Sequence, residues 1–131
     1  MANSKTKIKG NTKIPNYDSE IEIEVDNKYE PYKKTIPSPT KYEGFTITWF
    51  NNFGVKNKAT GNNAKATYTI KLKNMPAGKR LFVRAAGGTI IEVTKKKPGA
   101  PEKDNLKYSD AGNGNIKFSW NEGDPPIGFG P

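Results

Sequence analysis

The sequence predicts an all-β protein, an antiparallel two-sheet β-sandwich of about seven to eight strands. Several short segments alternate apolar and polar residues, which is the period of a strand with one buried face. Thirteen glycines and ten prolines are scattered without a period, as the many turns of an all-β domain require. No segment of ten or more residues has a convincing helical period, so we expect no helix.

The N-terminal segment is basic. Residues 1–16 contain only two large aliphatic residues. They also contain four lysines: Lys5, Lys7, Lys9 and Lys13. Lysines at alternating positions discourage pairing with the edge of another sheet. We therefore expect residues 1–16 to be a basic N-terminal arm or an edge strand, and residues 17–120 to form the β-sandwich domain.

The clearest strand covers residues 19–26. Three aliphatic side chains at alternate positions from Ile21 to Val25 predict a buried face, and four acidic side chains share the other face. Successive side chains on one strand face are about 7 Å apart, too far to share one metal ion without help from a loop. We therefore favour a cross-strand ladder with Lys71 and Lys73, and we expect no metal site.

Four aromatic residues are poorly explained by strand alternation. Tyr29, Tyr32 and Tyr42 lie in a segment with three prolines, residues 27–42, which indicates a loop or an irregular crossing. Phe53 follows a strand and lies next to a predicted turn. Aromatic faces with polar neighbours bind sugars, so these four residues are the candidate ligand-binding residues. The alternative is that the tyrosines lie over the core as a lid.

Two further strands precede the central hairpin. Residues 44–52 alternate so that Phe45, Ile47 and Trp49 are expected to face the core. Residues 64–73 resume with the same period. The hairpin itself covers residues 80–94, because two strand-forming runs flank a glycine pair that accepts positive φ. Both of its faces carry apolar groups, so we expect cover on both faces or one small exposed patch.

The C-terminal third is expected to hold one more hairpin. Residues 95–104 are a charged Pro/Gly loop, and residues 106–120 form strands around a glycine-containing turn. Trp120 shares a face with Ile116 and Phe118, so we assign it to the core. Residues 121–131 have no periodicity and are expected to be a Pro/Gly-rich tail or linker.

A tryptophan on an inner strand of a sandwich is also a feature of immunoglobulin-like domains. With Trp49 in that position, the expected layout resembles bacterial immunoglobulin-like surface modules in architecture. The chain has no cysteine pair of the kind that joins the sheets of antibody domains. The resemblance implies an immunoglobulin-like β-sandwich.

The composition excludes much chemistry. The chain has neither Cys nor His, so disulfides, thiolate nucleophiles, common zinc ligands and the commonest general base are absent. No serine is part of a G-x-S-x-G motif, and no glycine-rich phosphate loop occurs. We therefore expect neither enzyme activity nor a cofactor.

The charge is strongly positive. The formal net charge is +9, from 22 Lys and Arg against 13 Asp and Glu, and only two of the basic residues are Arg. A lysine-dominated surplus favours weak, non-specific attraction to polyanions over specific nucleic-acid recognition, which favours arginine. No apolar run is long enough for a membrane span.

Two functions are compatible with these features. The first is a non-catalytic extracellular accessory module, secreted or at the cell surface as part of a larger chain, that binds polysaccharide weakly. The alternative is a structural spacer or an assembly subunit of a bacterial surface fibre, pilus or virion, with a neighbouring protein module as its partner. The open edges that a sandwich leaves motivate this alternative.

Overall fold

The computed structural model describes residues 3–10, 17–96, 106–121 and 125–131. These residues form twelve strands and one short 3-10 turn, Ala86–Gly88. The strands are β1 Asn3–Ile8, β2 Ile21–Asp26, β3 Tyr29–Lys33, β4 Thr40–Tyr42, β5 Phe45–Asn51, β6 Phe53–Asn57, β7 Thr67–Lys73, β8 Arg80–Arg84, β9 Ile90–Lys95, β10 Lys107–Gly112, β11 Asn115–Asn121 and β12 Ile127–Gly130. The predicted all-β class is confirmed, but the described strands number twelve instead of seven or eight.

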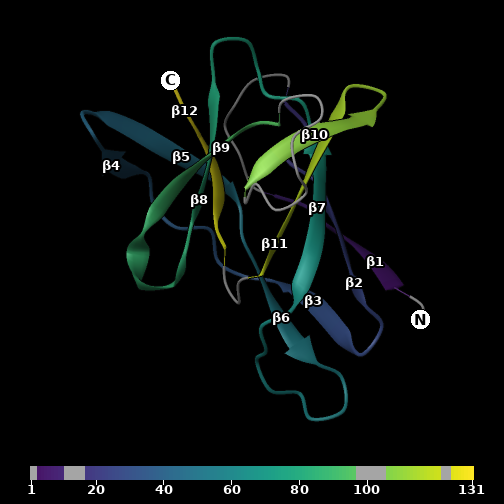
Figure 1. The fold of residues 1–131 in the computed structure, drawn as a ribbon. Helices are drawn as coiled ribbons and strands as arrows, with labels where there is room; N and C mark the ends of the chain where they lie inside the picture. Colours follow the sequence, from purple (N-terminus) through teal and green to yellow (C-terminus); the bar gives the residue numbers. More distant parts are fainter. Residues whose placement is uncertain (1–2, 11–16, 97–105, 122–124) are drawn as a thin grey trace.

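Ten of the strands belong to one sheet, in the order β1-β2-β7-β11-β10-β9-β8-β12-β5-β4, and β3 pairs with β6 separately (Figure 1). Within the large sheet, β9 and β10 are parallel and are joined at only two residue pairs, Lys107 with Thr94 and Tyr108 with Lys95. The other strand pairs are antiparallel. The sheet therefore consists of a first half, β1-β2-β7-β11-β10, and a second half, β9-β8-β12-β5-β4, with a narrow connection between them.

The two halves share one main core. From the first half, the alternate residues of β2 and β7 are buried, as their sequence pattern predicts, with Ile23 and Ile70 at 0% exposure. From the second half, Val83 of β8 and Phe129 of β12 join the same cluster. Buried side chains of the first half thus pack against buried side chains of the second half. Each half therefore buries the face of its strands that is turned toward the other half.

The second half also buries its other face. Trp49 of β5 and Phe82 of β8 form a second cluster, which Ile36, Tyr42 and Phe45 cover. The expectation that the Trp49 face is turned toward the main core is wrong, because Phe50 on the opposite face of β5 occupies that core. Both faces of this strand are apolar, so alternation alone does not distinguish them.

The predicted central hairpin is present, but residues 85–89, which include a 3-10 turn, connect its strands in place of the two-residue turn expected at Gly87 and Gly88. Strands β8 and β9 are antiparallel, and Gly87 and Gly88 between them have φ of 85° and 90°. Left-handed backbone of this kind favours glycine. Leu81 contributes to the main core and Phe82 to the second cluster, so the hairpin is covered on both faces.

The C-terminal segment differs from the expectation of a tail or linker. Strand β12 is hydrogen-bonded to β8 on one side and to β5 on the other, and all four of its residues are buried. Ile127 and Phe129 project into the main core, whereas the intervening Gly128 lies close to Trp49. A side chain at Gly128 would place its Cβ 2.6 Å from the carbonyl oxygen of Thr48. This close contact requires glycine at position 128 of β12, beside the second cluster.

The N-terminal segment is an edge strand where it is described. β1 pairs with β2 along its whole length, and Ile8 at its end is buried. The buried amide of Asn51 joins this edge to the second half, because its Nδ2 donates to the carbonyls of Ile8 (3.0 Å) and Ser19 (2.9 Å). Residues 11–16 of the predicted arm lie outside the described residues.

Candidate functional site

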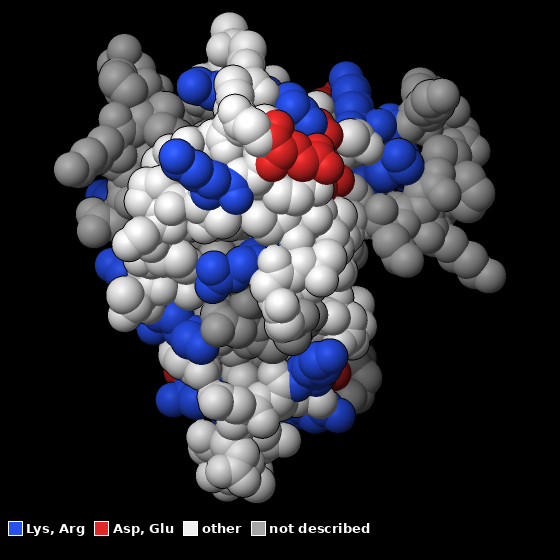
Figure 2. Space-filling model, turned by 90° about the vertical axis from the view of Figure 1, so that its left-hand side faces the viewer, with Lys and Arg blue, Asp and Glu red and all other residues white. Residues whose placement is uncertain are grey.

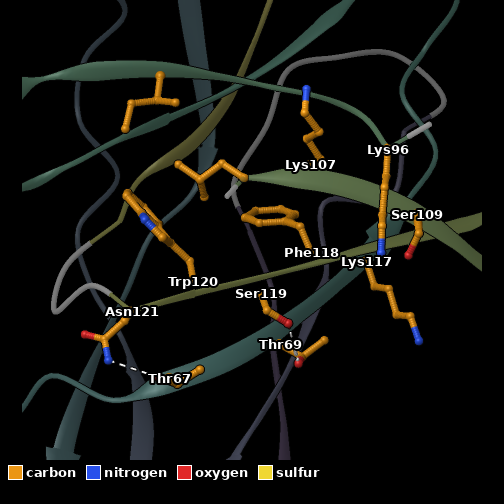
Figure 3. Close-up of a pocket in the computed structure, with 12 residues that line it drawn as sticks. Thr67, Thr69, Lys96, Lys107, Ser109, Lys117, Phe118, Ser119, Trp120 and Asn121 are labelled. Atoms are coloured by element: carbon orange, nitrogen blue, oxygen red, sulfur yellow. Dashed lines mark hydrogen bonds between the residues drawn. The ribbon is translucent and has the colours of Figure 1, made fainter. Parts of the chain in front are cut away.

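A depression opens where the two halves of the large sheet separate. β10 leaves β9 after two residue pairs and then joins β11 over residues 109–112. Beyond those pairs, Ile90 to Val93 of β9 bond to β8, and Phe118 to Asn121 of β11 bond to β7. Among the described residues, no strand lies between these two facing edges. The depression has a volume of about 930 Å³ (Figure 3).

Apolar side chains from both halves form part of its lining. Phe118 and Leu106 are almost fully buried, with 3% and 7% exposure, and Ile91 and Trp120 are partly exposed. The indole of Trp120 is packed against the margin of the main core. A partly exposed indole beside a polar rim is an amphipathic surface on which the apolar face of a sugar ring can stack.

Hydroxyl and amide groups line another part. Asn121 Nδ2 donates to Thr67 Oγ1 at 3.0 Å, and the hydroxyls of Thr69 and Ser119 are 3.0 Å apart. These side chains come from neighbouring strands, because β7 and β11 pair in register and place Thr69 opposite Ser119. Figure 3 shows both pairs on the side of the depression formed by β7 and β11.

Three lysines complete the lining: Lys96, Lys107 and Lys117. Lys107 Nζ donates to the Thr94 hydroxyl at 3.1 Å, a neutral partner. None of the twelve lining residues that the structure describes is acidic. The depression therefore combines one indole, several hydroxyl and amide groups, and positive charge.

Sequence reasoning assigned Trp120 to the core and did not select it as a binding residue. The assignment is partly right, since the ring contacts the main core. Trp120 is the last inward-facing residue of β11, and Asn121 ends the strand. Cover by neighbouring strands ends at the end of a strand. A large aromatic residue at the last inward-facing position, such as Trp120 on β11, could therefore have suggested a partly exposed ring.

The structure separates the four predicted ligand-binding residues. Tyr29 and Tyr32 lie on β3, which pairs with β6. The Tyr32 hydroxyl donates to Asn63 Oδ1 at 2.6 Å, and its ring lies against Gly54, where an added Cβ would be 2.6 Å from the ring atom Cζ. Tyr29 is partly buried against the main core.

The other two lie in separate clusters. Tyr42 on β4 makes edge-to-face contacts with Phe45 and Phe82, with ring centroids 5.7 and 6.1 Å apart, and covers the second cluster. Phe53 begins β6 with 0% exposure, and its ring centroid is 5.1 Å from that of Tyr68. A fully buried ring presents no face to a ligand. None of the four lines the depression.

The acidic face of β2 forms a ladder with lysines. Glu22 is directly opposite Lys71 of β7 and, on its other side, Lys7 of β1, and Glu24 is opposite Lys5. The predicted pairing with Lys71 is thus confirmed, whereas the register places Lys73 opposite Asn115 of β11. Across the described residues, no group of three or more His, Cys, Asp or Glu side chains is placed to hold a metal ion.

Both arginines lie away from the depression, over the second cluster. Arg80 donates from Nη2 to Glu92 Oε1 at 2.8 Å and from Nε to Oε2 at 3.1 Å. This hydrogen-bonded pair lowers the pKa of Glu92 and raises that of Arg80. The Arg80 guanidinium also lies over the rings of Phe45 and Phe82, and that of Arg84 lies 5.8 Å from the Trp49 ring centroid. The arginines serve as cover for aromatic rings.

Basic side chains are dispersed on the face seen in Figure 2. They occur singly or in small groups separated by uncharged surface, and acidic side chains lie among them, most visibly in a group near the top of the view. A dispersed distribution of this kind attracts polyanions weakly and without a defined orientation. On that face, therefore, charge alone does not define a site.

Comparisons of the chain with protein-family models, with curated proteins and with solved structures found no match. In the part of the chain that the structure describes, no helix has the length and apolar character needed to cross a membrane.

Proposed function

We propose that the protein is a non-catalytic module that binds a polysaccharide in the depression between β9 and β11. The observation that carries this proposal is the partly exposed Trp120 indole, which lines a hollow of about 930 Å³ together with hydroxyl and amide side chains from the opposite face of β11 and β7. Sugar rings need an apolar surface for stacking and polar groups for their hydroxyls, and the depression offers both.

The open strand edges add further polar groups. Every second backbone N–H and C=O of residues 118–121 points away from β7, toward the depression, because only the alternate residues bond to that neighbour. The pairing of β10 with β11 ends at Lys117, so this part of the β11 edge suits the hydroxyl groups of a sugar chain. The hollow is open, so contacts are few and binding is weak.

The lining supports a binding role without catalysis. The described residues of the lining contain no carboxylate, and glycoside hydrolysis generally uses two. The chain also contains neither His nor Cys to act as base or nucleophile. The proposed role is that of an accessory module, secreted or at the cell surface as part of a larger chain.

The architecture fits this role as well. Two halves of a sheet that face one another across a shared core support a two-layer β-sandwich. Such a scaffold presents open edges and loops to ligands while its layers stay rigid.

The test is a Trp120→Ala variant against a panel of soluble and insoluble glycans. We expect wild-type protein to be retained on at least one glycan and Trp120→Ala to lose that retention. Tyr32→Ala and Tyr42→Ala are matched aromatic controls outside the depression, and they are expected to bind as the wild type does. If no glycan retains the wild-type protein, the proposal is refuted. If Tyr32→Ala or Tyr42→Ala abolishes binding instead, the tyrosines first selected from the sequence form the site.

Fluorescence provides an independent measurement. The chain has two tryptophans, and Trp49 has 2% exposure. In a Trp49→Phe variant, Trp120 is the only indole, so its emission reports the depression directly. Saturating glycan should shift that emission and protect it from a soluble quencher. An unchanged spectrum at saturation would place the ligand elsewhere.

A second candidate function is assembly with a neighbouring copy or module. It is favoured by the two ends of the ten-stranded sheet, because β1 pairs only with β2, and β4 only with β5, among the described residues. Open edges are surfaces for strand addition. Sedimentation at high concentration tests this function, and a strict monomer would leave only the role of a spacer.

A further inference from the structure

We propose that the open edge of β1 binds an acidic strand of a different protein, in which acidic side chains alternate with small or β-branched ones. Such a partner belongs to the second candidate function, assembly with a neighbouring module, on which this inference rests. Glycan binding in the depression is not needed for it. The observations that carry it are the charge pattern of the sheet next to β1 and the regularity of this edge.

Strand β1 is a regular edge strand. It lies at one end of the ten-stranded sheet, and Figure 1 shows it at the margin of the fold, beyond β2. It pairs with β2 at six consecutive residues without a register shift, and no other described strand pairs with it. Every second backbone N–H and C=O of such a strand is directed away from its neighbour. The edge therefore has the geometry that strand addition requires.

The protection of this edge depends on charge. Proteins protect edge strands by short length, proline, bulges or charged side chains. Strand β1 contains no proline or bulge and has six residues, whereas β4 at the other end of the sheet has three. Lys5 and Lys7 are exposed on β1. Positive charge repels a basic strand and attracts an acidic one, so this protection selects among partners.

The exposed face of the sheet alternates in charge from β1 to β7. Lys7 of β1 is opposite Glu22 of β2, and Glu22 is opposite Lys71 of β7. Lys5 is likewise opposite Glu24. Unlike charges directly opposite one another stabilise a strand pair, and like charges destabilise it. A strand added at the free side of β1 continues the alternation when it places acidic side chains opposite Lys5 and Lys7.

The same lysines disfavour a second copy of this chain as the partner. Consider two β1 strands paired antiparallel, with their exposed faces on the same side of the joined sheet. In any register that pairs four or more residues of each strand, Lys5 lies opposite the second copy's Lys5 or Lys7, which is a repulsive pair. The acidic strand β2 of a second copy is already paired on both sides, with β1 and β7. The partner is therefore a different protein.

The inward-facing positions of β1 define the rest of the pattern. Ser4 and Thr6 are partly buried, and Ile8 is buried. Hydroxyl side chains pair well with Ser and Thr across neighbouring strands, and β-branched residues favour strands. The expected ligand is an extended segment that matches the six residues of β1, with Glu or Asp at alternate positions and residues such as Thr or Val between them.

The experiment titrates the full chain with short fluorophore-labelled peptides and follows fluorescence anisotropy. The test peptide alternates Thr and Glu over the length of β1. One control peptide has Gln in place of every Glu. A second control peptide keeps every Glu but has Pro in place of its inner Thr residues, which prevents a continuous strand ladder. We expect the test peptide to bind, the Gln peptide to bind more weakly, and the Pro peptide to lose binding although its charge is unchanged.

Double variants of the full chain test the two lysines. Lys5→Gln combined with Lys7→Gln should weaken binding of the test peptide by about twofold to thirtyfold, because two cross-strand pairs of opposite charge are lost. Lys33→Gln combined with Lys41→Gln makes the same change in net charge at exposed positions away from β1 and should bind as the wild type does. Lys5→Arg combined with Lys7→Arg keeps the charge and should also retain binding. Circular dichroism of each variant verifies folding.

Hydrogen exchange of the wild-type chain provides a measurement that needs no variant. An added strand forms hydrogen bonds with the outward-directed N–H groups of β1. Exchange at alternate residues of β1 should therefore slow when the test peptide is saturating. Diffuse attraction between charges forms no such backbone bonds and leaves the exchange of β1 unchanged.

Several outcomes would overturn the acidic partner. Equal binding of the test and Pro peptides, or equal losses in both Gln double variants, would show diffuse attraction by the whole charge of +9. Unchanged exchange of β1 at saturation would place the peptide elsewhere, and no binding of any peptide would also refute it. Sedimentation of the chain alone separates this failure from that of assembly. If the chain self-associates but binds no peptide, assembly stands and the acidic partner of β1 is refuted.

Discussion

Phe129 tests whether the C-terminal segment belongs to the core. Its ring is 2% exposed, stacks on Phe50 with centroids 4.7 Å apart, and meets Tyr17 edge to face at 4.9 Å. Phe129→Ala removes this ring from the main core. Truncation of a buried Phe to Ala costs about 3–5 kcal/mol, because transfer energy is lost and a cavity remains.

Urea unfolding monitored by tryptophan fluorescence measures the effect. With a slope of about 2 kcal/mol/M, the expected cost lowers the midpoint by about 1.5–2.5 M. Pro131→Ala, at the exposed residue that follows β12, is the control and should leave the midpoint unchanged. Phe129→Leu leaves a smaller cavity and provides a folded comparison if Phe129→Ala is too unstable. A midpoint within about 0.3 M of wild type for Phe129→Ala, at unchanged slope, would refute a buried β12.

Three further changes test particular contacts. Gly128→Ala should destabilise the protein by about 1–3 kcal/mol, because its Cβ would be 2.6 Å from the Thr48 carbonyl oxygen; unchanged thermal stability would contradict this close approach. Asn51→Ala leaves two buried carbonyls without their donor and should cost about 1–3 kcal/mol in urea unfolding, whereas the exposed Asn121→Ala should cost little. Glu92→Gln should lower the thermal midpoint at pH 7. Since the folded pKa of Glu92 is lowered, its contribution is present above its ordinary value of about 4.3 and lost as pH falls through the folded value. The variant and the wild type should therefore converge as the pH falls through the lowered pKa of Glu92, and a constant difference down to strongly acidic pH would exclude an ionic origin.

The local pattern of the sequence predicted the class and several elements. Alternation identified the buried faces of β2 and β7, and the glycine pair identified the β8–β9 hairpin. The hairpin of β10 and β11 was predicted from the turn between them. These features depend on interactions between residues close in the chain, through side-chain direction and turn geometry, so they can be read from the sequence.

The same pattern could not assign elements whose place depends on distant neighbours. Strand β12 has the sequence IGFG, with only two large side chains, and it is a strand because β5 and β8 bond to it on both sides. Trp49 and Phe50 are both apolar and adjacent, and only the packing of the two halves decides which of them faces the main core.

The candidate site is likewise a product of tertiary structure. The sequence by itself determined that the protein is all-β and strongly basic and contains no cysteine or histidine. It did not indicate that β9 and β11 border the depression. Their positions depend on the short pairings of β10 with each of them, between residues that are far apart in the chain. Trp120 and the three lining lysines belong to separate segments, and only the pairing of the sheet halves brings them to one depression.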